Sequence, residues 1–153
     1  MKDSQRKAMW AKINNISKGS IIKTNKQVIE DWNKRYKTEK MKFGVRDEVN
    51  EVTRIVNNVK ITGNEKEVLI RKASLLMASI AWAQPFLDAN KRTAYITAND
   101  FLNKYGYDLP LKTKTDELEL NKLLLHIQDE RSRLNPLITK RIIFYTRRNI
   151  QKL

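Results

Sequence analysis

Apolar residues along most of the chain recur three and four positions apart, which is the spacing of a helix face rather than of a strand. Glycine (4) and proline (3) are scarce, which argues against a fold rich in tight β-turns. Only 27–29, 59–61 and 108–111 are short strand candidates. The pattern predicts helices over about residues 24–37, 46–58, 67–83, 91–104, 118–127 and from 136 onward.

Turn and capping residues separate these helices. The segment 17–20 is expected to be a break, with Thr24 and Asn25 as candidate N-caps of the first helix. Asn135 followed by Pro136 is typical of an N-cap and the first helical position.

The helix predicted over 67–83 differs from the others because it is apolar on every side. Arg71 and Lys72 are its only charged residues after Glu67. A helix of this kind belongs at the centre of a fold. It breaks at 84–85 and is followed by the next helix, so the sequence predicts an all-α fold around a buried central helix hairpin.

Composition narrows the class of protein further. With 153 residues, the chain fits a single domain over 1–153, with 1–23 as a basic N-terminal extension. Cysteine is absent, which excludes disulfides, thiolate metal sites and a cysteine nucleophile. The sequence has no apolar run of membrane-spanning length and no secretory signal at 1–10, so we expect a cytoplasmic protein without a membrane partner.

The net charge of +14 is concentrated at the two ends of the sequence. Residues 1–42 carry twelve basic and four acidic side chains, whereas 131–153 carry seven basic and no acidic ones. Such ends attract polyanions in a salt-sensitive way. One alternative is therefore a basic nucleic-acid-binding protein, although no recognised nucleic-acid motif is present and we do not expect specific binding.

The segment 84–93, QPFLDANKRT, joins the two central helices and carries the candidate chemistry. Asp88 or Asn90 is expected to cap the second helix. Lys91 and Arg92 place two cations in its first turn, where they oppose the helix dipole. Asp88 could compensate them by an ion pair with Arg92, and a bound phosphate or a magnesium-bridged phosphate could do so as well.

This segment resembles the motif of the Fic/Doc family, H-x-F-x-[DE]-[AG]-N-[GK]-R, and its Doc (death-on-curing) branch in particular. The segment 43–47 (FGVRD) is similar to a segment upstream of the motif in Doc-like chains, and 105–107 (YGY) is similar to one that follows their motif helix. The resemblance covers about 24–150 and implies a Fic/Doc-type helical bundle. The motif positions in register are Phe86, Asp88, Ala89, Asn90, Lys91 and Arg92.

The resemblance also implies a toxin-type transferase that uses Mg²⁺ and ATP, or another nucleoside triphosphate. Asp88 would hold the metal on the phosphates. Ala89, Asn90 and Lys91 would line an anion hole, and Arg92 would clamp a phosphate. Most Fic members transfer AMP to a protein hydroxyl. Lys91 stands where most members have glycine, and in Doc-like members this change accompanies phosphorylation of elongation factor Tu, so an elongation-factor-like target is one option.

Gln84 departs from the family motif, which has histidine at this position. The histidine accepts the proton of the attacking hydroxyl, and an uncharged amide cannot do so. We therefore expect a chain that binds nucleotide but transfers poorly. Gln84 is either natural or an engineered change, and the sequence does not separate the two. An alternative is a non-catalytic nucleotide- or partner-binding module of the same fold.

The remaining candidate residues give weaker indications of function. His126, the only histidine, lies among leucines and is expected to be a half-buried helix residue rather than a replacement base. The inhibitory pattern [ST]-x-x-x-E-[GN] of the family is absent, since Leu118 follows Glu117. Any inhibitor would then be a separate antitoxin, whose acidic segment could use the basic ends.

Overall fold

The fold is known from a computed structural model, which describes residues 16–153. This part of the chain forms six helices and one two-stranded sheet, so the predicted all-α class is confirmed. None of these helices is both long enough and apolar enough to cross a membrane. The elements are α2 (Lys18–Arg35), α3 (Glu48–Asn58), α4 (Glu65–Ala83), α5 (Asn90–Lys104), β1 (Tyr107–Asp108), α6 (Lys114–Asp129), α7 (Pro136–Asn149) and β2 (Gln151–Lys152).

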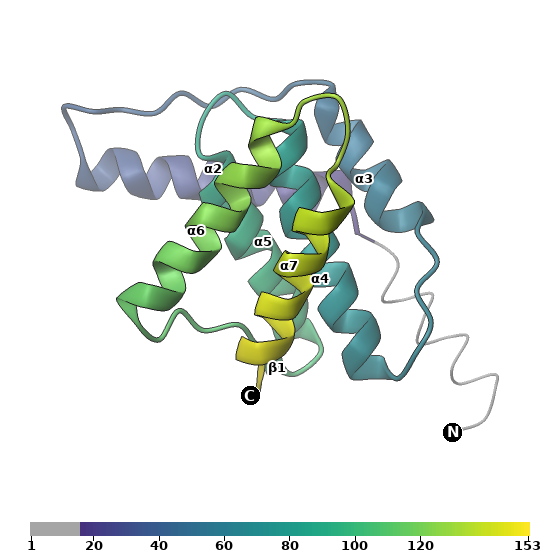
Figure 1. Cartoon of the computed structure of the whole chain (residues 1–153). Coiled ribbons are helices and arrows are strands. Elements are labelled where there is room, and N and C mark those ends of the chain that lie inside the picture. The colour runs from purple at the N-terminus through teal and green to yellow at the C-terminus, as the bar shows by residue number, and fades with distance from the viewer. Residues whose placement is uncertain (1–15) are drawn as a thin grey trace.

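Helix α4 is the centre of the molecule, as its apolar sequence predicts. It packs against α3, α5, α6 and α7, which surround it in Figure 1. Its neighbour α5 follows after a short loop, and the small residues Ala94 and Ala98 are fully buried in this helix. Two closely packed helices thus hold both ends of the motif loop, which makes the loop a rigid platform for side chains.

One charge on α4 is buried, which the sequence pattern did not indicate. Lys72 is fully buried, and its Nζ donates hydrogen bonds to the carbonyl oxygens of Val56 and Val59. These carbonyls lie at the C-terminal end of α3, where backbone acceptors lack partners within the helix. Burial lowers the pKa of the Lys72 amine. Lys72 therefore caps α3 from the core side.

Helix α2 begins earlier than the sequence suggested. Ser17, placed in the expected break, is instead its N-cap, and the side-chain oxygen accepts a hydrogen bond from the backbone N–H of Ser20 at 3.1 Å. The expected caps are wrong because Thr24 and Asn25 lie inside the helix. Buried Ile21 extends the apolar face, so packing outweighs the breaker residues. Residues 18–23 of the expected extension thus belong to α2, residues 16 and 17 directly precede the helix, and residues 1–15 lie outside the described residues.

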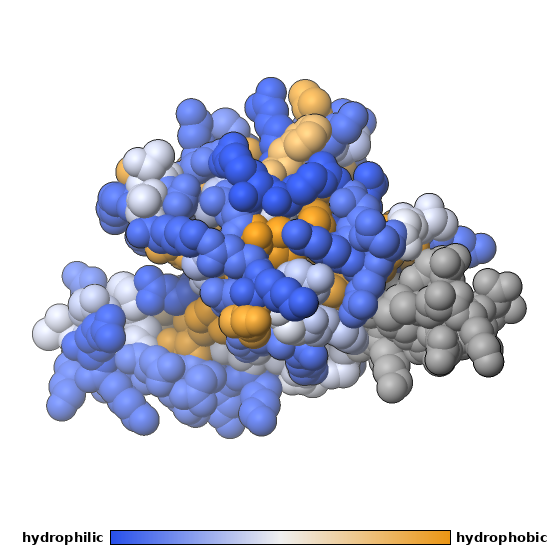
Figure 2. All heavy atoms as spheres, turned by 90° about the horizontal axis from the view of Figure 1, so that it is seen from below, coloured by the Kyte–Doolittle hydropathy of each residue, from blue (hydrophilic) through white to orange (hydrophobic). Residues whose placement is uncertain are grey.

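The other boundaries agree more closely with the sequence. Asn135 caps α7 with its side chain, and Pro136 occupies the first turn, as predicted. Of the strand candidates only Asp108 pairs, since β1 and β2 form a short antiparallel ladder. The candidate 27–29 is wrong because Val28 and Ile29 belong to the buried face of α2. On the face shown in Figure 2, polar side chains cover most of the surface and apolar ones show in small areas.

Because Tyr145 is buried, the free energy of unfolding decreases as the pH rises in the alkaline range. The residue is 1% exposed, and burial, followed by the nearby charges of Asp116 and Glu119, raises its pKa to about 12. Above pH ~10 the unfolded chain releases this proton and the folded chain keeps it. The stabilisation is therefore complete below pH ~10 and is lost as the pH rises through 12.

We expect the free energy of unfolding to fall by about 2–3 kcal/mol more in the unsubstituted chain than in Tyr145→Phe between pH ~9 and ~12. Urea unfolding of both chains at the two pH values measures this difference. Equal losses in the two chains would contradict the assignment to Tyr145.

Candidate functional site

The loop between α4 and α5 begins and ends on a strained residue. Gln84 closes α4 with φ 52°, and Ala89 precedes α5 with φ 64°. In the described part of the chain, these are the two non-glycine residues with positive φ. Such conformations cost about 1–3 kcal/mol each and persist where the surroundings hold them, often at functional sites.

The side chain of Asn90 stabilises this loop conformation by hydrogen bonds. Its Oδ1 accepts from the backbone N–H of Phe86 at 3.0 Å, and its Nδ2 donates to the Phe86 carbonyl at 2.9 Å. Nδ2 also donates to Oε1 of Gln84 at 3.2 Å. Phe86 itself is fully buried, so it anchors the loop in the core as expected. Asn90 therefore fixes the loop from inside.

Because Asn90 turns back into the loop, the predicted cap of α5 is wrong. Ala89 occupies the N-cap position and no side chain caps this end. The carboxylate of Asp88 is also turned elsewhere, since its Oδ2 accepts from the backbone N–H of Lys42 at 2.7 Å. The first-turn N–H groups of a helix have no acceptors within the helix. The N-terminus of α5 is therefore open to an external anion.

A second segment, 41–46, lies along the motif loop and completes its support. The Arg46 N–H donates to the Pro85 carbonyl at 2.7 Å, and the Leu87 N–H donates to the Gly44 carbonyl at 3.1 Å. A Cβ on Gly44 would come within 2.6 Å of Leu87 Cγ, so glycine permits this close approach. Residues 43–47 were noted in the sequence because they resemble a segment of Doc-like chains. The structure places this segment beside the motif loop.

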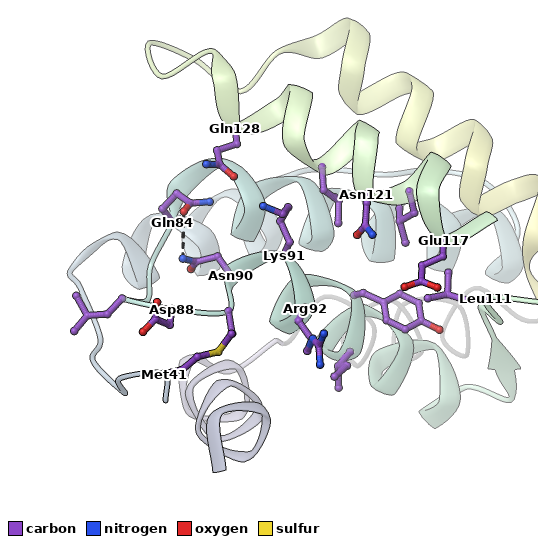
Figure 3. Close-up of a pocket in the computed structure, with 16 residues that line it drawn as sticks. Met41, Gln84, Asp88, Asn90, Lys91, Arg92, Leu111, Glu117, Asn121 and Gln128 are labelled. Carbon is purple, nitrogen blue, oxygen red and sulfur yellow. Dashed lines mark hydrogen bonds between the residues drawn. The ribbon is translucent and has the colours of Figure 1, made fainter. Parts of the chain in front are cut away.

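A pocket of about 660 Å³ opens between the motif loop, the first turns of α5, and α6. Figure 3 shows Asn121 and Gln128 on α6 across from Lys91 and Gln84. All six residues predicted for the site line this pocket. Its full lining is Met41, Gln84, Leu87, Asp88, Ala89, Asn90, Lys91, Arg92, Tyr95, Ile96, Leu111, Glu117, Leu120, Asn121, Leu124 and Gln128.

The two cations of the first turn are not neutralised by Asp88. The expected ion pair between Asp88 and Arg92 is absent from the described residues, where Arg92 forms no ion pair. Its guanidinium instead lies 5.2 Å from the centre of the Trp32 ring. Lys91 is half-buried beside it. Two unpaired cations at an uncapped helix N-terminus give the pocket a strong preference for anions.

The residues fit a magnesium ion that is bound mainly by phosphate. Asp88 offers Oδ1, which has no hydrogen-bond partner in the described part of the chain. Over residues 16–153 no group of three or more acidic, histidine or cysteine side chains could hold a metal alone. Mg²⁺ typically takes one or two carboxylates, several waters and the phosphates of its ligand. The arrangement therefore suits a metal that arrives with a nucleotide.

The sequence predicted the role of His126 correctly but missed the pocket residues of α6. His126 is half-buried on α6 and does not line the pocket, in agreement with the expected packing role. The pocket residues Glu117, Asn121 and Gln128 were not predicted as site residues. They lie on one side of α6 at helical spacing, but the polar face of any surface helix gives the same signal. Only the fold brings α6 over the motif.

The described parts of the two basic ends lie largely on different helices, α2 and α7. Helix α2 packs on α5 and α3, whereas α7 packs on α4 and α6. Two cations of α7 are already paired, Arg147 with Glu67 and Arg148 with Glu119. The nucleic-acid alternative stays a prediction, because residues 1–15 of the N-terminal basic end lie outside the described residues.

The fold and site define a mostly helical domain with a pocket at the N-terminus of α5, lined by the motif residues. The model of the Fic/DOC family matches residues 15–102, which include this pocket's motif loop and most of α5. The chain belongs to the Fic/DOC family. No match was found among the curated proteins or among the solved structures.

Proposed function

We propose that this chain is a Doc-like member of the family that binds a magnesium–nucleoside triphosphate, with ATP the first candidate, in the pocket between α5 and α6. The observation that carries this proposal is the uncapped N-terminus of α5 with Lys91 and Arg92 in its first turn. Both backbone donors and side-chain cations there favour a phosphate chain. Asp88 would hold the metal, and the metal would neutralise phosphate charge.

The ancestral reaction is transfer of AMP or phosphate to a hydroxyl of a target protein. Gln84 stands at the position of the motif histidine, and its carboxamide carries no basic lone pair at neutral pH. It can orient a hydroxyl but cannot take its proton. The chain as written is therefore expected to bind nucleotide and to be severely impaired in transfer.

A non-catalytic binding module of the same fold is the second candidate. The side chain of Gln84 is integrated into the loop on both of its polar atoms. Its Nε2 donates to the Ala81 carbonyl at 2.6 Å, and its Oε1 accepts from Asn90. A residue that holds the platform while lacking basicity fits a protein that uses the pocket to sense nucleotide or to dock a partner.

We expect titration calorimetry with Mg·ATP to detect binding to the chain as written, and Arg92→Ala to weaken it by about 10- to 100-fold. The estimate follows from loss of one hydrogen-bonded charge, about 1.5–3 kcal/mol. Arg133→Ala, an exposed arginine paired with Glu130 on the α6–α7 connection, is the matched control and should leave the affinity unchanged. Equal affinities in all three chains would contradict the pocket assignment.

Regulation by a separate antitoxin is part of the same proposal. An acidic segment of such a partner would find unpaired cations on α2, including Lys23, Lys26 and Lys34. Because these cations are exposed, the complex should weaken as salt is raised.

A further inference from the structure

Arg92, the phosphate-binding candidate, is supported by an aromatic residue that the motif does not include. The guanidinium carbon of Arg92 lies 5.2 Å from the ring centre of Trp32, which comes from the last turns of α2. Arg92 is otherwise exposed and makes no hydrogen bond or ion pair in the described part of the chain. The Trp32 ring is therefore the contact that restrains this side chain.

Trp32 is itself held in place. Its indole Nε1 donates to the carbonyl of Glu39 at 2.7 Å, and its ring centre lies 4.2 Å from that of Tyr36. The ring is half-buried, so it has little freedom to rotate. A fixed ring can keep the guanidinium in one place before a phosphate arrives, which reduces the entropy lost on binding.

The next residue of α2, Asn33, acts on the acidic side chain of the motif, Asp88. Asn33 donates to the Met41 carbonyl at 3.0 Å and accepts from the Met41 N–H at 2.8 Å. Met41 is followed by Lys42, whose backbone N–H donates to Oδ2 of Asp88 at 2.7 Å. Asn33 thus fixes the backbone that orients the Asp88 carboxylate and leaves Oδ1 free.

We propose that the C-terminal turns of α2 form a positioning element for the nucleotide site. Trp32 orients Arg92 toward phosphate, and Asn33, through Met41 and Lys42, orients Asp88 toward the metal. The inference takes its ligand from the proposed function. The contacts of Trp32 with Arg92, and of Asn33 with Met41, are observed in the structure whatever the ligand is. Neither Trp32 nor Asn33 touches the reacting atoms, so both are positioning residues.

A double-mutant cycle tests the contact between Trp32 and Arg92. Trp32→Leu is expected to weaken Mg·ATP binding by about five- to tenfold. In an Arg92→Ala background the same change should have an effect of less than about twofold, because the partner is gone. Trp32→Phe keeps an aromatic face and should recover most of the affinity. Equal losses with and without Arg92 would show a merely structural role and overturn the proposal.

Asn33→Ala tests the second contact with a different readout. We expect the ratio of the ATP affinity with Mg²⁺ to the ATP affinity without Mg²⁺ to fall severalfold, because the Asp88 carboxylate loses its fixed orientation. Trp32→Leu should weaken ATP binding by the same factor with and without Mg²⁺ and leave this ratio unchanged. A change of the ratio in Trp32→Leu, or none in Asn33→Ala, would contradict the division of roles.

Nuclear magnetic resonance without nucleotide separates this inference from the proposed function. The Arg92 Nε–H signal, assigned by its loss in Arg92→Ala, should show an ordered side chain in the chain as written and a mobile one in Trp32→Leu. Trp82→Leu is the matched control because Trp82 also donates its indole N–H to a carbonyl, at 2.9 Å, and should leave this signal unchanged. If Arg92 is equally mobile in all chains, the positioning element is wrong, whatever the nucleotide does. If Arg92 follows the expectation and no chain binds nucleotide, the proposed function alone fails.

Discussion

Gln84→His is expected to raise the rate of group transfer by about 10²–10⁴-fold over the chain as written, which is the usual contribution of a general base. The backbone accepts the change, because position 84 is left-handed with φ 52° and histidine is among the residues enriched in that conformation. The new ring would line the same pocket as Asp88 and Arg92. The initial rate of label transfer from ATP to a lysate protein measures the gain.

The matched control for this gain is Gln84→Asn. Asparagine also favours a left-handed backbone and also carries an uncharged amide, so it alters the side chain without supplying a base. No gain is expected from it. If the chain as written already transferred at the rate of the histidine variant, the missing base would not be the limit and the assigned mechanism would be wrong.

Asn90→Ala is expected to lower the free energy of unfolding by about 3 kcal/mol. The change removes the partners of the Phe86 N–H and carbonyl, and each buried polar group left unpaired costs about 1–3 kcal/mol. It also frees Gln84, whose Oε1 loses its donor. For a chain of this size the melting temperature should fall by about 6–12 °C.

Asn103→Ala on the same helix provides the control for Asn90. Its Nδ2 donates to the Tyr107 carbonyl at 2.8 Å, but in an exposed position where water can replace it. A loss below about 1 kcal/mol is expected. If urea unfolding gave Asn90→Ala the same small loss, the loop would not depend on the Asn90 side chain.

Local patterns predicted the elements of this fold more reliably than their ends. The apolar character of α4 indicated its central position, because a helix without a polar face is stable in water only when it is buried on all sides. The start of α2 was misjudged because Gly19 and the serines around it are turn-forming residues in isolation. Tertiary packing of Ile21 decided against that local preference. Lys72 was missed for a similar reason, since only the fold shows that the end of α3 lies within its reach.

The candidate site shows the same limit. The linear motif placed Gln84, Asp88 and Arg92 in one pocket, because they follow each other along a single loop and helix turn. It misassigned the cap, since the geometry of Asn90 depends on how the loop folds back. Trp32 lies in the helix predicted over residues 24–37, and nothing in the sequence links it to Arg92, 60 positions away. Contacts between distant segments are the part that the sequence pattern did not reveal.

The most direct test of the account is label transfer in a bacterial lysate with ATP labelled at the α or the γ phosphate and with magnesium present. The chain as written and Gln84→His are compared side by side. We predict transfer by the histidine variant and little or none by the chain as written. A label from the α position indicates AMP transfer, and one from the γ position indicates phosphorylation. Transfer by neither chain, although both bind Mg·ATP, would contradict a transferase site and favour the binding module.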